Sequence, residues 1–323
     1  MGKYKQFIDT VKSGKNFLIA SHSHPDGDGI GSTIALARGI ESLGGKNAVM
    51  FNANKVPYNL EFLPGSKEMV TKIPEGMLFD VTILVDCADL KRVGGEAADL
   101  TKERTGKVIL IDHHEQSGAD FDISCVDVTA AAAGEVVYDI LKEMGVKITP
   151  DVATLILTTF IVDTGSFRYS NTSAKLMRDA AELMDAGAST WRITVELHES
   201  DPMAYMKLLR LVLETFDHSA DGKVAWIVLT QQMLDDANAP LDVAEEFINF
   251  PRSIKGVEVA ILFRELKDGK WKVSFRSKDK VDVQKIAKKF EGGGHSHAAG
   301  CSPEGNLAEI KERVFDEVQK HLL

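Results

Sequence analysis

The hydrophobic positions of residues 1–190 form short apolar runs that alternate with longer segments of helical periodicity. Runs rich in β-branched side chains have the length of buried strands at 16–20, 81–85 and 108–111. Apolar positions recur at helical spacing in 31–43, 131–144, 150–162 and 173–186. Strands that alternate with helices predict an α/β fold, in which helices cover both faces of a doubly wound, mainly parallel sheet.

The pattern changes between residues 188 and 202. A helical stretch at 191–199 leads into Asp201-Pro202, and an amphipathic helix is predicted at 203–216. Three strands and two helices follow, at 224–229, 257–263, 271–275, 283–290 and 307–322. The turn-like segment 267–270 predicts that the last two strands form an antiparallel hairpin. We therefore predict a first domain at 1–188, a linker at 189–202 and a second, smaller α/β domain at 203–323.

The composition is that of a globular chain. Its 323 residues are 44% hydrophobic and 27% charged, which excludes a disordered or fibrous protein. The longest apolar runs fall far short of the ~20 residues that a spanning helix needs, and the N-terminus lacks the apolar core of a secretory signal. Three widely spaced cysteines without a CxxC pair suit a reducing compartment. We expect a cytoplasmic protein that does not associate with membranes.

The charge is unevenly distributed along the chain. The formal net charge is −10, but residues 251–290 hold 12 Lys and Arg against 5 Asp and Glu, so this segment carries +7 and the remainder −17. Because affinity for long nucleic acids depends on many cationic contacts, the negative net charge argues against binding of long duplexes. The uneven distribution favours a small anionic ligand at the basic segment. A solvated lysine-rich surface would give the same local charge.

Histidine and aspartate residues follow each of the three predicted buried strands. They are His22, Asp26 and Asp28, then Asp86, then Asp112, His113 and His114. The carboxyl ends of parallel strands are where α/β proteins bind ligands, so we expect these side chains to converge. Imidazole and carboxylate without thiolate suit Mn²⁺ or Mg²⁺, with zinc as an alternative. Four such carboxylates would balance two divalent cations, the arrangement that clamps a phosphate during in-line displacement.

Two other interpretations of residues 21–32 remain. The segment resembles the HxHxDH run of metallo-β-lactamase-type hydrolases, but Gly27 stands where that run needs its last histidine. Alternatively, it is an Asp/Gly turn that caps the next helix, with Asp28 as the N-cap. Capping alone does not account for the two histidines. His24 is better explained as an exposed loop residue than as a ligand.

The order and spacing of these residues resemble the DHH phosphoesterases. Four motifs carry the resemblance, at residues 22–32, 86–89, 112–114 and 163–167. The segment Gly292-Gly-Gly-His-Ser-His-Ala-Ala-Gly300 resembles the signature of the DHHA1 domain. The length is similar to that of the oligoribonuclease and pAp-phosphatase subgroup, whereas the RecJ exonucleases are longer. Family II pyrophosphatases have a different second domain.

The resemblance implies a role for each of these residues. It implies six metal ligands: His22, Asp26, Asp28, Asp86 as the bridging carboxylate, His113 and Asp163. His114 would act beside the scissile phosphate, and Asp112 would orient the histidines. The implied cofactors are two divalent cations, Mn²⁺ first, with Mg²⁺ or Co²⁺ as alternatives.

The second domain offers groups that can hold phosphate. Backbone N–H groups can approach a phosphate closely at Gly292, Gly293 and Gly294 because no Cβ intervenes. The other candidates are Arg264, Arg276, Ser277 and His295, since a guanidinium binds phosphate bidentately. A plain turn between a strand and a helix is the alternative explanation for the glycines.

These observations predict a metal-dependent phosphoesterase that acts on short oligonucleotides (nanoRNA), on 3′-phosphoadenosine 5′-phosphate (pAp), or on both. A hydroxide activated by two metal ions would attack in a cleft between the domains. The alternatives are a phosphodiesterase for cyclic or linear dinucleotides, an exopolyphosphatase, and a nucleotide-binding module without catalysis. Expected partners are short oligonucleotides or phosphorylated nucleotides, and a homodimer is left open.

Overall fold

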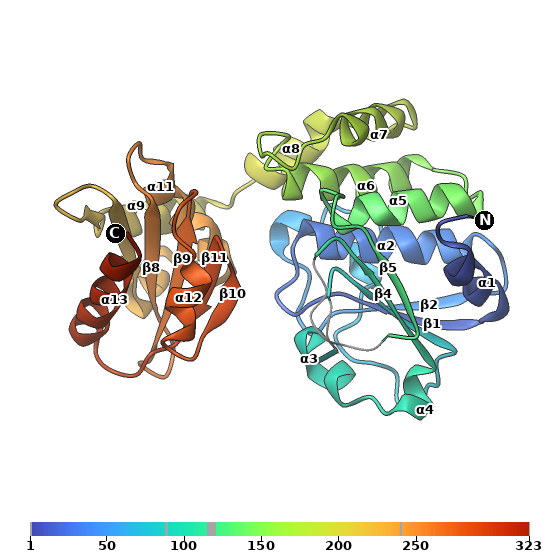
Figure 1. Ribbon diagram of the computed structural model, residues 1–323, viewed down its shortest axis with the longest axis horizontal. Helices are drawn as coiled ribbons and strands as arrows, with labels where there is room; N and C mark the ends of the chain where they lie inside the picture. Colours follow the sequence, from blue (N-terminus) through green and yellow to red (C-terminus); the bar gives the residue numbers. More distant parts are fainter. Residues whose placement is uncertain (1, 88–89, 115–120, 240, 323) are drawn as a thin grey trace. The chain divides into compact units, whose positions relative to one another are not determined.

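A computed structural model of the chain describes residues 2–87, 90–114, 121–239 and 241–322. The chain divides into two compact units, Met1–Ser200 and Asp201–Leu323, and each has its own sheet (Figure 1). The segment 189–202, predicted as the linker, contains helix α8 (Thr190–His198). Ile193 and Leu197 of this helix are buried in the core of the first unit.

The first unit is built on a five-stranded parallel sheet with the order β2-β1-β3-β4-β5. Its strands are β1 (Asn16–Ala20), β2 (Asn47–Phe51), β3 (Val81–Val85), β4 (Lys107–Asp112) and β5 (Ile123–Val126). The chain passes from β1 to β2 on one side and then to β3 on the other. The crevice beyond the carboxyl ends of β1 and β3 is therefore the point where the winding reverses, which is where such sheets bind ligands.

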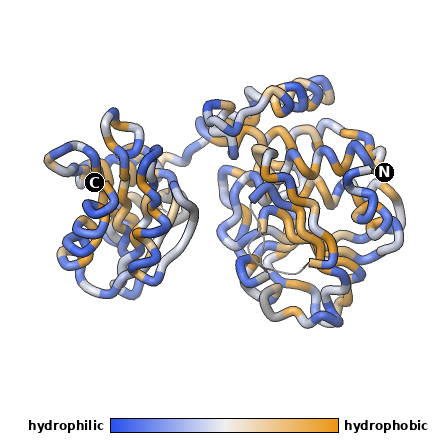
Figure 2. The backbone as a smooth tube through the Cα atoms, viewed as in Figure 1, coloured by the Kyte–Doolittle hydropathy of each residue, from blue (hydrophilic) through white to orange (hydrophobic). Residues whose placement is uncertain are grey.

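Alternate side chains of the strands enter two separate cores. Phe17, Ile83 and Ile109 point to one face, under helices α1 (Lys5–Ser13), α2 (Gly27–Glu41), α5 (Ala133–Met144) and α6 (Pro150–Asp163). Leu84 and Leu110 point to the other, where the short elements α3 (Leu90–Val93), η3 (Gly95–Asp99) and α4 (Lys102–Thr105) lie. Helix α7 (Ala174–Asp185) packs on α6. The apolar strands at the centre of this unit stand out in Figure 2. The predicted doubly wound sheet is confirmed.

The sequence pattern predicted the central strands of this sheet but not its two edge strands. β1 and β3 have the predicted bounds, whereas the edge strands β2 and β5 and helix α1 were not predicted. Both edge strands are short and partly exposed, so their sequences are hard to distinguish from those of loops. Helix α2 begins four residues earlier than expected, because the Asp26 side chain accepts hydrogen bonds from its first N–H groups.

The second unit has a six-stranded mixed sheet with the order β10-β11-β9-β8-β7-β6. Its strands are β6 (Asp217–His218), β7 (Val224–Leu229), β8 (Val259–Glu265), β9 (Trp271–Ser277), β10 (Gly293–His295) and β11 (Ala298–Cys301). The antiparallel hairpin of β8 and β9 is confirmed, and β7 pairs with β8 in parallel.

Helices cover both faces of this second sheet. Helices α12 (Val283–Lys288) and α13 (Leu307–Leu322) cover the face to which Ile261, Val273 and Phe275 point. The other helical elements of the unit are α9 (Met203–Leu213), α10 (Gln231–Ala237), η4 (Leu241–Ile248) and α11 (Asn249–Ser253). Within the described part of the chain, the helices are too short or too polar to cross a membrane.

Candidate metal centre

The loop after β1 delivers two aspartates to the start of α2 in different ways. Oδ1 of Asp26 accepts hydrogen bonds from the backbone N–H groups of Asp28 and Gly29, both at 3.0 Å. Asp26 is therefore the N-cap, and the alternative interpretation in which Asp28 caps this helix is wrong. Asp28 lies in the first turn and is fully buried. Its Oδ1 accepts from Ser32 Oγ at 3.0 Å, and its other hydrogen bonds come from a different helix.

Asp86, directly after β3, stands between histidines from two other strand ends. Its Oδ2 lies 3.4 Å from Nε2 of His22, and its Oδ1 lies 3.7 Å from Nε2 of His113. The Nδ1 atom of His22 is 2.9 Å from the carbonyl oxygen of Ser23, which turns Nε2 toward the carboxylates. Asp86 has a φ of 54°, a left-handed conformation that is uncommon for a residue other than glycine and that costs stability.

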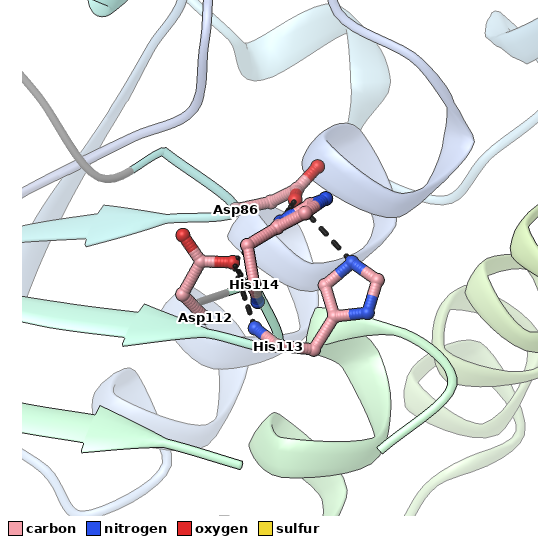
Figure 3. A group of neighbouring side chains, drawn as sticks. All are labelled: Asp86, Asp112, His113 and His114. Carbon is pink, nitrogen blue, oxygen red and sulfur yellow. Dashed lines mark hydrogen bonds and ion pairs between the residues drawn. The ribbon is translucent and has the colours of Figure 1, made fainter. Parts of the chain in front are cut away.

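The turn after β4 presents Asp112, His113 and His114 together (Figure 3). Oδ1 of Asp112 accepts from the backbone N–H groups of His113 at 2.7 Å and His114 at 3.0 Å, and it lies 2.8 Å from Nδ1 of the His114 ring. Although burial opposes it, this bonding lowers the pKa of Asp112 and raises that of His114. Asp112 thus fixes the positions of both histidines.

His113 provides the test of whether a cation fits. Its Nε2 atom is buried and has no hydrogen-bond partner among the described residues. It faces three carboxylates instead, with Asp163 Oδ2 at 3.4 Å, Asp86 Oδ1 at 3.7 Å and Asp28 Oδ2 at 3.8 Å. An unpartnered imidazole nitrogen among carboxylates 3.4–3.8 Å away has the donor set of a divalent metal site.

The described residues form three overlapping groups that could hold a metal ion. The groups are His22 with Asp26 and Asp86; Asp28 with His113 and Asp163; and Asp86 with Asp112, His113 and His114. The structure thus brings together the six residues predicted as ligands, with Asp112 and His114 beside them. Asp86 belongs to two groups, as a bridging carboxylate would. Asp89 of the second motif lies outside the described residues.

The carboxyl groups of this centre have raised pKa values because they are buried close to one another. Burial raises the pKa of Asp28 to about 6, and the nearby charge of Asp26 adds to the shift. Burial likewise raises the pKa of Asp86 to about 7 and that of Asp163 well above its usual value, with repulsion from the other carboxylates. Burial would lower the pKa of His22, but the charges of Asp86 and Asp26 raise it to about 9. A bound cation would relieve this repulsion.

The candidates in the second unit lie on two faces of its sheet. Arg264 of β8 pairs with Lys272, and Arg276 of β9 pairs with Ala260, so both arginines belong to the same face. Ser277 belongs to the opposite face, where its Oγ lies 2.9 Å from Nδ1 of His297. The structure therefore does not bring Ser277 together with the arginines.

The glycine-rich segment forms neither a helix nor a strand–helix turn. Gly293 and Gly294 belong to β10, which pairs with β11 in a hairpin. A Cβ at Gly294 would overlap the carbonyl oxygen of Ala298, whereas one at Gly293 would meet nothing within 4 Å. The backbone of His295 pairs with Ala298, and its side chain lies outside the described residues.

Sequence reasoning missed several residues that shape the metal centre. Asn52, at the end of β2, donates from Nδ2 to the carbonyl oxygen of His22 at 2.8 Å. The N–H groups of Ala133 and Gly134, at the start of α5, donate to Asp28. Asn171 donates from Nδ2 to the carbonyl oxygen of Asp163 at 3.1 Å. Small and amide residues of this kind carry no signal in a single sequence, since their role depends on long-range contacts.

Comparison with known proteins agrees with this geometry. Residues 16–160 match the DHH family, N-terminal domain, and residues 221–320 match the DHHA1 domain. The bifunctional oligoribonuclease and PAP phosphatase NrnA of Thermus thermophilus is 35% identical over 94% of this chain and 89% of its own length. The protein of the same name from Bacillus subtilis is 28% identical over 92% of each chain.

A solved structure extends the likeness to the whole fold. An exopolyphosphatase-related protein from Bacteroides fragilis superposes with a TM-score of 0.92, at 27% identity, over 98% of this chain and 96% of that one. The region that matches the DHH family contains the His/Asp clusters at the ends of β1, β3 and β4. The chain belongs to the DHH family of phosphoesterases, among the members that also carry a DHHA1 domain.

Proposed function

We propose that this chain is a metal-dependent phosphoesterase that hydrolyses short oligoribonucleotides and pAp. The observation that carries the proposal is the position of His113, whose buried Nε2 faces Asp28, Asp86 and Asp163. No hydrogen-bonding role within the described residues accounts for that nitrogen. The NrnA relatives are named for oligoribonuclease and PAP phosphatase activities, and the chain aligns with them over nearly its full length.

The donor groups divide into two metal sites that share Asp86. His22 and Asp26 would complete one site, while Asp28, His113 and Asp163 would complete the other. Divalent cations bound there would activate water and stabilise the charge that develops on the phosphate. Oxygen and imidazole donors without thiolate support Mn²⁺, with Mg²⁺ or Co²⁺ as alternatives.

His114 is the proposed catalytic residue beside the phosphate. Its Nδ1 is held by Asp112, whose Oδ1 is also bound by two backbone N–H groups. The ring therefore keeps one orientation, and the carboxylate favours its protonated form. A protonated imidazole can donate a hydrogen bond to a phosphate oxygen and supply the proton that the leaving oxygen needs.

The second unit is proposed to capture the rest of the substrate. Arg264 and Arg276 share one face of its sheet, and the segment 251–290 that contains them is the basic part of an otherwise acidic chain. These arginines, the backbone of Gly293 and Gly294, and His295 would bind a phosphate that is not cleaved. Ser277 would contribute indirectly, through its contact with His297. We place the enzyme in the cytoplasm, where its cysteines would stay reduced.

A substrate panel tests this function. The purified protein should hydrolyse pAp and a ribodinucleotide with Mn²⁺, lose activity in excess EDTA, and prefer substrates of two to about five nucleotides. A 24-mer should compete weakly, because the −17 charge outside the basic segment repels a long strand. Failure to hydrolyse any phosphoester with Mn²⁺, Mg²⁺ or Co²⁺ would overturn the proposal.

The Bacteroides fragilis structure supports a second candidate function. That protein is described as exopolyphosphatase-related, and its fold matches this chain over nearly all of both lengths. Inorganic polyphosphate offers phosphates to the same metal centre but no base or ribose. Including it in the panel separates the two functions, since an exopolyphosphatase would cleave it faster than the dinucleotide.

A further inference from the structure

We propose that Glu135 and Lys175 are positioning residues that hold the first turn of α5 in place for Asp28, and so maintain one of the two metal sites. The inference rests on the proposed metal centre and adds residues from α5 and α7 to it. Neither residue touches the donor atoms directly. The argument follows the hydrogen bonds from Asp28 outward.

Asp28 caps a helix to which it does not belong. The N-cap position of α5 is Ala132, which has no side-chain cap of its own. The N–H of Ala133 instead donates to Asp28 Oδ2 at 2.7 Å, and that of Gly134 donates to Oδ1 at 2.9 Å. Both carboxylate oxygens are thus oriented by the start of α5, where the helix dipole also favours a negative charge. The direction in which Asp28 presents Oδ2 to His113 depends on the position of this turn.

Glu135 and Lys175 hold that turn from the side of α7. Glu135 is buried, and its Oε2 accepts from the backbone N–H of Ala131 at 2.9 Å. Its Oε1 accepts from Nζ of Lys175 at 2.9 Å, and the same Nζ donates to Asp179 of α7 at 2.8 Å. The pair therefore joins the residues just before α5 to the next layer of helices.

The same turn is also linked to a second donor of this metal site. Asn171 donates from Nδ2 to the carbonyl oxygens of Ala131, at 3.3 Å, and Asp163, at 3.1 Å. Gly134 packs so closely on α6 that a Cβ there would overlap Thr159. Residues 131–135 thus contact Asp28 directly and Asp163 through Asn171. The His22, Asp26 and Asp86 group rests on other contacts, such as that of Asn52 with His22.

This arrangement leads to a selective expectation. Loss of the Glu135–Lys175 pair should weaken the site that contains Asp28 and Asp163 and leave the site that contains His22 and Asp26 intact. Removal of residues that orient metal ligands commonly weakens metal binding about 10- to 100-fold. A general loss of stability would affect both sites alike.

The test is titration of metal-free protein with Mn²⁺ by calorimetry, with the melting temperature measured in parallel. The variants are Lys175→Met and Glu135→Gln, whose amide oxygen can still accept from Ala131. Lys142→Met is the matched control. Lys142 also links α5 to α7, through ion pairs with Asp179 at 3.0 Å and Glu182 at 3.7 Å. Asn171→Ala, at an exposed position, is a second variant that should fold even if Lys175→Met does not.

Wild-type protein should bind two Mn²⁺ ions. In Lys175→Met and Asn171→Ala, one of the two binding events should weaken about 10- to 100-fold, while Lys142→Met should keep both within about two-fold. Equal weakening of both events, or the same effect in Lys142→Met, would overturn the inference. So would unchanged binding in folded Lys175→Met or Asn171→Ala, and in that case the proposed function would stand. Absence of binding by the wild-type protein would overturn the metal centre itself.

Discussion

Nδ1 of His114 and Oδ1 of Asp112 lie 2.8 Å apart. The same Oδ1 also accepts a hydrogen bond from the backbone N–H of His114, so the two residues are joined through both the backbone and the side chain. Oδ1 also accepts from the N–H of His113, and these hydrogen bonds lower the pKa of Asp112 and raise that of His114, which favours an ionised carboxylate and a proton on Nδ1 of His114. The turn after β4 therefore holds the His114 ring on Asp112, while it presents Nε2 of His113 to the carboxylates of Asp28, Asp86 and Asp163.

Loss of the Asp112 charge should move the pH profile of catalysis. Asp112→Asn keeps an acceptor for the backbone N–H groups but lowers the pKa of His114, which the carboxylate now raises. If His114 acts as the protonated donor, the basic limb of kcat/KM should shift to lower pH. His114→Ala should reduce kcat about 10²- to 10⁴-fold with Mn²⁺ affinity retained. An Asp112→Asn profile identical to wild type would contradict this role.

Asp86→Asn should abolish turnover and yet stabilise the metal-free protein. Asparagine tolerates the left-handed backbone that Asp86 adopts, and it carries no charge among Asp26 and Asp28. We expect a gain on the order of 2–4 kcal/mol in the free energy of unfolding at pH 8 in EDTA. The reason is that the variant no longer has to hold an ionised, buried carboxylate, whose raised pKa shows that the folded state disfavours it. Urea unfolding and activity assays measure the two effects. More than a tenth of wild-type activity under saturating Mn²⁺ would exclude the bridging role.

The stability of metal-free protein should fall as the pH rises from about 4 to about 9. Asp28 and Asp86, with pKa values raised to about 6 and about 7, keep protons in the folded state at pH values where the unfolded chain has lost them. Ionisation across that window therefore destabilises the fold. The pKa of His22 is raised to about 9 in the folded state. The protonated ring therefore contributes stability at pH values below its ordinary pKa, and this contribution is lost as the pH rises through about 9.

Melting temperatures in EDTA at pH 5, 7 and 9 test this dependence. Added Mn²⁺ should raise the melting temperature more at pH 8 than at pH 5, because the ligands must lose their protons to bind it. In Asp86→Asn the fall between pH 5 and 7 should be smaller. Stability of the metal-free wild type that increases over this range would show that the acids do not repel one another as described.

Substitutions in the second unit should separate binding from chemistry. Arg276→Ala and His295→Ala should each reduce kcat/KM for a dinucleotide about 5- to 150-fold, the equivalent of a lost phosphate hydrogen bond of ~1–3 kcal/mol. Cleavage of a small aryl phosphodiester should fall much less, and Mn²⁺ affinity should not change, because the metal donors belong to the first unit. Equal losses on both substrates would place these residues at the reacting centre.

Two adjacent glycines offer a matched test of phosphate approach. Gly294→Ala should destabilise the β10–β11 hairpin, since its φ of 138° and the nearby carbonyl of Ala298 exclude a Cβ. Gly293→Ala should leave the melting temperature unchanged, because a Cβ there meets no atom within 4 Å. If a phosphate contacts this backbone, Gly293→Ala should still weaken pAp binding. Unchanged affinity would remove Gly293 from the proposed binding site.

Local pattern was sufficient to predict much of the fold and the meeting of the His/Asp clusters that follow β1, β3 and β4, whereas Asp163 was expected there only from the resemblance to the DHH family. β1 and β3 are continuous buried runs, and their bounds follow directly from where the apolar residues stop. Because parallel strands end at one edge of a sheet, the residues after them had to lie close together. The two edge strands escaped prediction because they are short and only partly buried, which leaves a weak signal in the sequence. Helix α1 buries Phe7, Ile8 and Val11 at helical spacing, so the sequence carried a signal for it that the prediction did not use.

The order of strands and polar residues along the chain indicates that the side chains after β1, β3 and β4 meet, but the way in which each is held depends on contacts between distant segments. Asp26 and Asp28 are two residues apart, and either could cap α2 by local geometry. The structure assigns the cap to Asp26, because Asp28 is bound by N–H groups of α5 that lie 105 and 106 residues away. Helical and strand periods are local properties of the chain. The orientation of a carboxylate depends on donors from helices that become neighbours only when the chain has folded.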